Sequence, residues 1–168
     1  VNTTALRQED PETKQSKVVG MPTEMALLDM IDKVEGVSGY YDQLRKDLQV
    51  NRVLQVPYSS ERKRMTTIYY EPSTDVLRVY VKGAPDILMQ EATQMMLQDG
   101  TIVPFTEDHR EALNNTVKRL SDNGFRTLLI GFRDVEAGRF LHRPDAPIFS
   151  NDAEAGRSVV DLKEYPID

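Results

Sequence analysis

One junction in the sequence, residues 76–86, constrains the fold more than any other segment. The run Val76–Val81 is rich in β-branched residues and predicts a strand, and Pro85 suits the first position of a helix. Between them lie Lys82 and Gly83, and a glycine without a Cβ lets a ligand approach the backbone. The junction predicts a strand, a turn and a helix that hold one ammonium at a concave edge, where a flat anionic ligand would fit. An ordinary structural corner with a surface lysine is the alternative.

Hydrophobic spacing predicts an α+β fold. A turn at residues 71–75 joins two strand-like runs and predicts an antiparallel hairpin. Thr23 is the expected cap of the first helix, and Gly36 and Gly124 are the expected stops of two helices. We expect strands at 53–58, 65–70, 76–81 and 126–132, and helices at 23–35, 40–50, 85–97 and from Thr106 onward.

Both ends of the chain lack a clear period. Residues 1–20 are polar and predict an exposed loop, with order resuming near Met21. Residues 135–168 carry prolines, glycines and many acids, and predict a loosely held, solvent-facing segment. We interpret 1–168 as a single domain with long loops within 1–17 and 135–168.

Composition argues against several classes of function. Twenty-one Lys and Arg against 27 Asp and Glu give a formal charge of −6, which disfavours extended contacts with nucleic acid or anionic lipid. The absence of cysteine excludes disulfides, thiolate chemistry and cysteine-ligated zinc, and the two histidines lie far apart. No apolar run approaches the roughly 20 residues that a bilayer requires, and no signal peptide opens the chain. We therefore expect a soluble protein in which any anion site is local.

Motifs of self-contained catalysis are missing from the sequence. There is no P-loop, no dinucleotide-binding glycine fingerprint and no hydrolase nucleophile elbow. Adjacent acids such as Glu107 and Asp108 are explained by the dipole of the helix that they open. We therefore predict no catalytic residue and no metal ligand within this chain.

Four short segments resemble, in order and spacing, the nucleotide-binding domain of P-type cation-transporting ATPases. With the residues between them they cover roughly 18–134, and the short linkers are most similar to the plasma-membrane-type calcium pumps. The resemblance implies a twisted antiparallel β-sheet flanked by helices, with ATP as ligand. The segments are Gly20–Leu28, Pro57–Met65, Val81–Asp86 and Gly124–Leu128.

The resemblance implies roles for the residues around the adenine base. Tyr58 stands where phenylalanine is usual and would stack on the ring, although a half-buried strand aromatic is the alternative. The stem of Lys82 would cover the base beside Gly83, while its ammonium stays available to the nucleotide. Glu24 matches the acid near the adenine amino group, but a first-turn helix acid is an equally ordinary explanation. Leu128 would form one side of the adenine pocket, although packing in the protein core would also explain a leucine at this position.

Two cations match positions that contact phosphate groups in the family. They are Lys63 and Arg126, and the planar guanidinium suits two-point contact with phosphate oxygens. Either could instead be a solvated surface cation. Ser60 departs from the pumps that have arginine at its position, which removes one expected phosphate contact.

The phosphorylated aspartate of the family lies in the string Asp-Lys-Thr-Gly-Thr, which does not occur here. The resemblance therefore implies an excised, monomeric domain that positions ATP, with Mg²⁺ accompanying the nucleotide, for attack by an aspartate of a separate domain. Its partners would be the phosphorylation and actuator domains of a calcium pump, at the cytosolic face of a membrane. Two alternatives remain: an interaction module that docks through its acidic tail or the Tyr40–Tyr41 region, and a free-standing hydrolase.

Overall fold

A four-stranded antiparallel sheet forms the centre of the chain in the computed structural model, which describes residues 3–11, 16–36, 40–49 and 51–137. The strand order is β3-β4-β5-β8. The strands are β3 (Arg52–Val56), β4 (Arg64–Glu71), β5 (Val76–Gly83) and β8 (Leu129–Glu136). Turn residues between Glu71 and Val76 join β4 and β5 into the predicted antiparallel hairpin, and the α+β prediction is confirmed.

Burial along the central strands follows from their positions in the sheet. Met65 to Tyr69 of β4 are buried on both faces, because β4 lies between two other strands and both faces of the sheet are covered there. On one face Ile68, Leu77 and Val79 form a small apolar core together with Ala137. The edge strand β8 is far less covered.

The N-terminal unit comprises β1 (Leu6–Glu9), β2 (Ser16–Val19), α1 (Pro22–Glu35) and α2 (Tyr40–Gln49). Its β1–β2 hairpin contradicts the prediction that residues 1–20 form an exposed loop. Tertiary contacts account for the hairpin, because Ala5 is fully buried against Leu28 and Tyr41, and Arg7 forms ion pairs with Asp32 of α1 and Asp42 of α2. Strands of four residues are too short to be recognised from the alternation of apolar and polar residues alone.

The two helices of this unit lie close to their predicted bounds. Gly36 ends α1 with a φ of 68°, as expected for a glycine stop. The predicted cap Thr23 is wrong, since Met21 is the N-cap residue, makes no side-chain cap hydrogen bond, and is followed by Pro22 in the first turn. Proline presets the first helical φ, so this start does not depend on a side-chain cap.

The segment after β5 differs more from its prediction. Helix α3 (Pro85–Glu91) ends six residues before the expected Leu97, because β6 (Gln94–Met96) pairs with β7 (Ile102–Pro104). Both strands are only three residues long, so their sequences show no strand pattern and their pairing becomes visible only in the structure. Helix α4 (Glu107–Asp122) begins as predicted, with Thr106 accepting a hydrogen bond from the backbone N–H of His109.

Strand β8 begins three residues later and ends four residues later than the predicted 126–132. Its bounds coincide with those of its partner, since Leu129 pairs with Gly83 and Glu136 pairs with Val76. Ala137 is fully buried, so the loosely held segment predicted from 135 onward begins too early. The remainder of that prediction, 138–168, lies outside the described residues.

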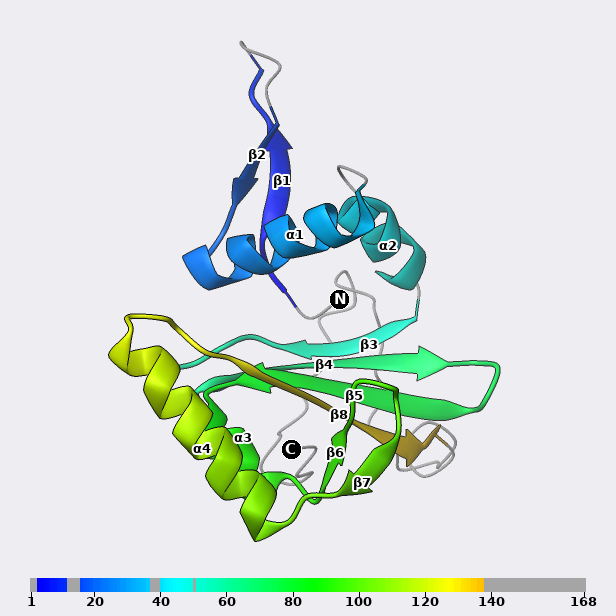
Figure 1. Cartoon of the computed structure of the whole chain (residues 1–168). Coiled ribbons are helices and arrows are strands. Elements are labelled where there is room, and N and C mark those ends of the chain that lie inside the picture. The colour runs from blue at the N-terminus through cyan, green and yellow to red at the C-terminus, as the bar shows by residue number, and fades with distance from the viewer. Residues whose placement is uncertain (1–2, 12–15, 37–39, 50, 138–168) are drawn as a thin grey trace.

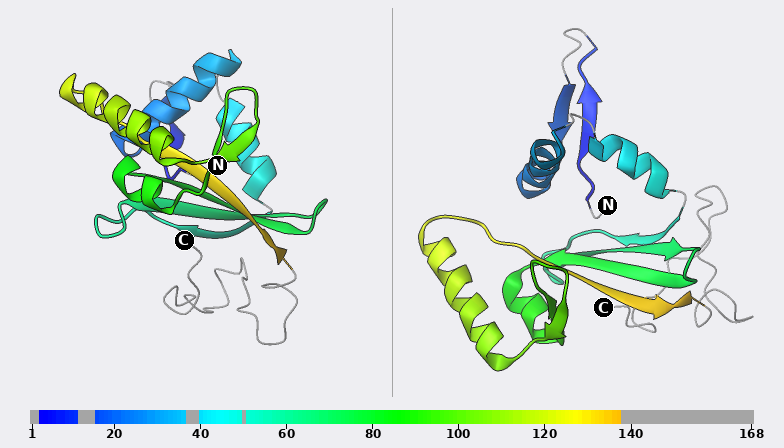
Figure 2. Two further views of the ribbon diagram at one scale, coloured as in Figure 1. Left: turned by 60° about the horizontal axis from the view of Figure 1, so that its bottom comes forward. Right: turned by 45° about the vertical axis from the view of Figure 1, so that its right-hand side comes forward.

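The elements are arranged in layers, with the sheet in the middle. Figure 1 shows the N-terminal unit on one side of the sheet and α3, α4 and the β6–β7 hairpin on the other, and the right-hand view of Figure 2 shows the same separation. Among the residues described, no helix combines the length and apolar character needed to cross a bilayer.

Candidate functional site

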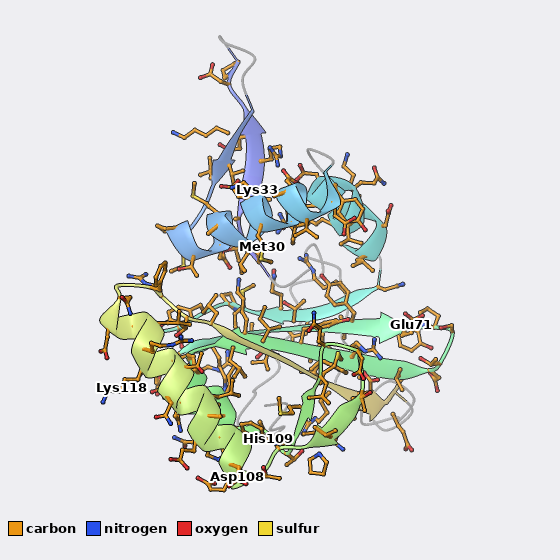
Figure 3. The ribbon with its side chains drawn as sticks, viewed as in Figure 1. Met30, Lys33, Glu71, Asp108, His109 and Lys118 are labelled. Carbon is orange, nitrogen blue, oxygen red and sulfur yellow. The ribbon has the colours of Figure 1, made fainter. Side chains whose placement is uncertain are left out.

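Antiparallel pairing brings three of the four sequence segments to one end of the sheet, and the first segment, at the start of α1, lies beside that end. Strand β3 ends there, β4 begins there, β5 ends at Gly83 and β8 begins opposite it at Leu129. We call this the site end of the sheet. Helix α1 begins beside it in Figure 1, and Figure 3 shows Glu71, the last residue of β4, at the opposite end. Gly83 and Leu129, which are 46 residues apart in the chain, are thus paired directly.

A buried ion pair joins the N-terminal unit to the sheet at this end. The ammonium of Lys82 on β5 lies 2.8 Å from Oε1 of Glu24 in the first turn of α1. The two side chains are only 9% and 7% exposed. Among the described residues Glu24 is the protein acceptor of the Lys82 ammonium, so two of its three N–H donors have no protein acceptor there.

The Glu24 carboxylate is held by a second residue, Thr4. The Thr4 hydroxyl donates to Oε2 at 2.6 Å, and the Thr4 backbone N–H lies 3.2 Å from both oxygens. Burial raises the pKa of Glu24, but the hydrogen bonds from Lys82 and Thr4 and the Lys82 charge outweigh it and leave the pKa below its ordinary value. Glu24 is therefore an anion at neutral pH that is fixed from two sides.

The loop between β3 and β4 lies against the end of β5. The backbone carbonyl of Lys63 accepts a hydrogen bond from the Ala84 N–H at 3.0 Å, and the Lys63 N–H donates to the Ser59 carbonyl at 2.8 Å. Lys63 adopts a left-handed conformation with a φ of 54°, which is uncommon for a residue with a side chain. A Cβ on Gly83 would lie 2.6 Å from the Lys63 carbonyl oxygen, so only glycine allows the loop to approach this closely.

The remaining predicted residues lie exposed around the same end. Tyr58 follows β3 by two residues and is 46% exposed, so the strand aromatic of the alternative interpretation is excluded. Arg126 is exposed, and Leu128, which directly precedes β8, is 36% exposed and is no core residue. The structure thus joins Glu24 to Lys82 directly and gathers the other residues at the same end, where no side-chain hydrogen bond or ion pair between described residues links them to that pair.

Two features of this end were absent from the sequence prediction. Thr4 was missed because no helical or strand period marks its segment, and only the folded hairpin brings it to Glu24, 20 residues away. Ile130 and Phe132 of β8 are 62% and 43% exposed and lie on the same face as Lys82, to which Ile130 is the paired neighbour. Their apolar character is visible in the sequence, but their exposure follows from the edge position of β8.

Comparison with known proteins decides the family. The model of the P-type ATPase cytoplasmic domain N matches residues 1–160. The chain belongs to this family. The resemblance of the four segments is thereby confirmed, and the α+β fold with its antiparallel sheet is consistent with an N domain.

Curated relatives of this N domain are calcium-transporting ATPases. The plasma membrane-type ATPase 3 of Oryza sativa subsp. japonica is 32% identical over 122 residues, 73% of this chain and 11% of the relative. The putative plasma membrane-type ATPase 7 of Arabidopsis thaliana is 27% identical over 128 residues, 76% and 12% of the two chains. Calcium-transporting ATPase 1 of Lactococcus lactis is 30% identical over 136 residues, 80% and 14%. The chain spans between 11% and 14% of the length of these relatives.

Proposed function

We propose that this N domain binds ATP at the site end of the sheet and positions it for attack by an aspartate in a separate domain. The observation that carries the proposal is the buried pair of Lys82 and Glu24. It holds an ammonium group with two unused N–H donors at the end of the sheet where the other predicted binding residues lie exposed. Phosphoryl transfer depends mainly on alignment and electrostatic stabilisation, so a domain without a catalytic group can contribute by positioning alone.

The residues present fit an adenine nucleotide. Tyr58 offers an exposed ring on which a purine can stack, and Leu128 offers an exposed apolar side chain. The spare donors of Lys82 suit the acceptors of a nucleotide, and the Glu24 carboxylate suits the adenine amino group. Gly83 keeps the end of β5 free of a side chain. Each of these contacts is part of the proposal.

Local charge favours the phosphates despite the net charge of −6. Because Glu24 neutralises Lys82, the positive charge for the phosphates would come from other cations at this end, and Lys63 and Arg126 are both exposed there. Both are free to turn toward a phosphate chain, and the guanidinium can make two parallel hydrogen bonds to it. We propose that they bind the phosphate groups, with Mg²⁺ carried by the nucleotide.

The proposal extends to the protein of which this domain would form a part. We propose that residues 1–168 act as one monomeric nucleotide-binding domain of a calcium pump, at the cytosolic face of its membrane. The calcium-transporting relatives support this assignment. The phosphorylation and actuator domains of the pump would be its partners, and affinity in their absence should be modest because they would supply part of the phosphate environment.

Titration of the ¹⁵N-labelled chain with ATP and ADP tests the proposal. We expect chemical-shift changes that cluster at Tyr58, Lys82 and Arg126. Tyr58→Ala should weaken binding by about 1–3 kcal/mol through the loss of stacking. Tyr40→Ala is the matched control, because Tyr40 is 38% exposed at the start of α2, away from the site end, and its loss should leave affinity unchanged.

The outcomes distinguish this function from the alternatives. Unchanged affinity in Tyr58→Ala would remove Tyr58 from the site, and the absence of any shift at saturating ATP would overturn nucleotide binding. Phosphate release by the purified chain would favour a hydrolase. An interaction module cannot dock through Tyr41, which is fully buried, and the acidic tail lies outside the described residues.

A further inference from the structure

We propose that Thr4 is a positioning residue of the nucleotide site, acting through Glu24 on Lys82. The inference rests on the proposed function and adds to it a residue from the N-terminal hairpin segment, which contributes no motif of its own. Thr4 does not need to touch the nucleotide for this role. It fixes the carboxylate that in turn fixes the ammonium.

The geometry forms a continuous chain of contacts from Thr4 to Lys82. Thr4 approaches the Glu24 carboxylate with two donors, its hydroxyl at 2.6 Å from Oε2 and its backbone N–H at 3.2 Å from each oxygen. Lys82 approaches Oε1 at 2.8 Å. Because the two side chains bond to different oxygens, the carboxylate can neither rotate nor shift without losing one of them.

This arrangement matters because the pair is buried. A buried carboxylate needs hydrogen bonds beyond its salt bridge to offset the loss of solvent, and Thr4 supplies them here. A carboxylate accepts at about four lone-pair positions, and the contacts from Thr4 and Lys82 account for about that number. Thr4 thereby fixes the orientation in which the Glu24 carboxylate holds the Lys82 ammonium.

Thr4 itself lies exposed, unlike the carboxylate that it holds. Its hydroxyl can therefore be removed with little loss of packing. The titratable groups coupled electrostatically to Glu24 are Lys82 on β5 and Tyr41 on α2, and neither of them bonds to the Thr4 hydroxyl. A change in the behaviour of Glu24 would then report on Thr4.

The test compares Thr4→Val with Thr4→Ser and the unaltered chain. Valine keeps the shape of threonine and the backbone N–H but removes the hydroxyl, whereas serine keeps the hydroxyl. We expect Thr4→Val to weaken ATP binding about fivefold, in line with a net hydrogen-bond contribution, and Thr4→Ser to restore it. Thr3→Val is the matched control, because the buried Thr3 hydroxyl accepts from the Ala5 N–H and does not touch Glu24, so its loss should affect stability without affecting affinity.

A second readout separates positioning from general damage. Carbon NMR of the labelled Glu24 carboxyl should give a higher pKa in Thr4→Val than in the unaltered chain, and the acid decline of ATP affinity should move to higher pH with it. A purely structural role would leave this pH profile in place. If Thr4→Val does not fold, Thr4→Ala serves in the same two measurements.

Each outcome decides the inference. Equal ATP affinity and an equal Glu24 pKa in the variant and the unaltered chain would overturn it while leaving nucleotide binding intact. A raised Glu24 pKa with weakened ATP binding would support it. If the unaltered chain binds no ATP, the proposed function fails, and a positioning role for Thr4 falls with it.

Discussion

Two ion pairs on the same strand and the same face show how differently the two ends of β5 are used. At the site end, Lys82 pairs with Glu24 at 2.8 Å, with side chains 9% and 7% exposed. Four residues earlier, Arg78 pairs with Asp134 of β8 through two hydrogen bonds of 2.7 Å, with side chains 42% and 39% exposed. The exposed pair has the better two-point geometry, and the buried pair lies among the candidate functional residues.

The two ion pairs differ mainly in how deeply their side chains are buried, and less in their hydrogen-bond geometry. Arg78 lowers the pKa of Asp134 by its hydrogen bonds, which outweigh a small opposing effect of burial, but solvent screens an exposed pair strongly. For Glu24 burial is the largest influence and raises the pKa, and the contacts of Lys82 and Thr4 together bring the pKa below its ordinary value. The charge of Glu24 is therefore kept by hydrogen bonds and an ion pair that act against burial, whereas the exposed pair needs less such compensation.

The largest expected effect is the loss of Lys82. Lys82→Met leaves the Glu24 charge buried without its partner and should lower the free energy of unfolding by about 3–5 kcal/mol. Urea denaturation at neutral pH measures this. The double variant Lys82→Met with Glu24→Leu removes both charges and should recover most of the loss, since a buried pair can be replaced by apolar residues at little cost.

Arg78→Met is the matched control for that experiment. It removes a cation from the same strand and face, and it should cost no more than about 1 kcal/mol. Equal losses of unfolding free energy in Lys82→Met and Arg78→Met would contradict the view that burial determines how much each ion pair contributes to stability.

A smaller effect is expected at two glycines that differ in crowding. A Cβ on Gly83 would lie 2.6 Å from the Lys63 carbonyl oxygen and 2.8 Å from the Arg64 Cβ, whereas one on Gly131 would meet only Val81 Cγ1, at 3.5 Å. Gly83→Ala should cost about 1–3 kcal/mol by displacing the loop, and Gly131→Ala should stay within about 0.5 kcal/mol of the unaltered chain. Thermal or urea unfolding of both variants measures the difference, and equal stability would show that the site end tolerates a side chain at Gly83.

The smallest expected effect is a change in how the stability of the fold depends on pH in the acid range. Because the pKa of Glu24 is lower in the folded chain than its ordinary value of 4.5, its contribution to stability is complete above that value and is lost as pH falls through the folded pKa. Urea midpoints measured between about pH 7 and about pH 3 should decline less steeply in Glu24→Gln. Asp134→Asn is the exposed counterpart and should flatten the decline less, and the reverse ranking would contradict the comparison.

Long periodic elements were predictable from the sequence, and short paired ones were not. The α1 and α2 helices carry apolar spacing over ten residues or more, and Gly36 marks the end of α1. The β1–β2 and β6–β7 hairpins have strands of three or four residues, whose existence depends on the partner strand. The local sequence pattern does not reveal the partner strand, so the first hairpin was predicted to be a loop and strand β6 of the second was predicted to be part of a helix.

The candidate site divides in the same way. The motif residues could be named from the sequence. The sequence could not reveal that Glu24 and Lys82 are buried against each other, because glutamate and lysine are usually exposed unless they are paired. It also could not find Thr4. The binding roles of Tyr58, Lys63, Arg126 and Leu128 stay predictions that the titration experiments address.

What the sequence by itself determined is the family, the α+β class and the order of the segments that meet at one end of the sheet, because these depend on local pattern and spacing along the chain. What only the tertiary structure decided is which polar groups are buried together. The value of a charge depends on its distance from water and from its partners, and those distances exist only once the hairpin, the helix and the sheet have packed.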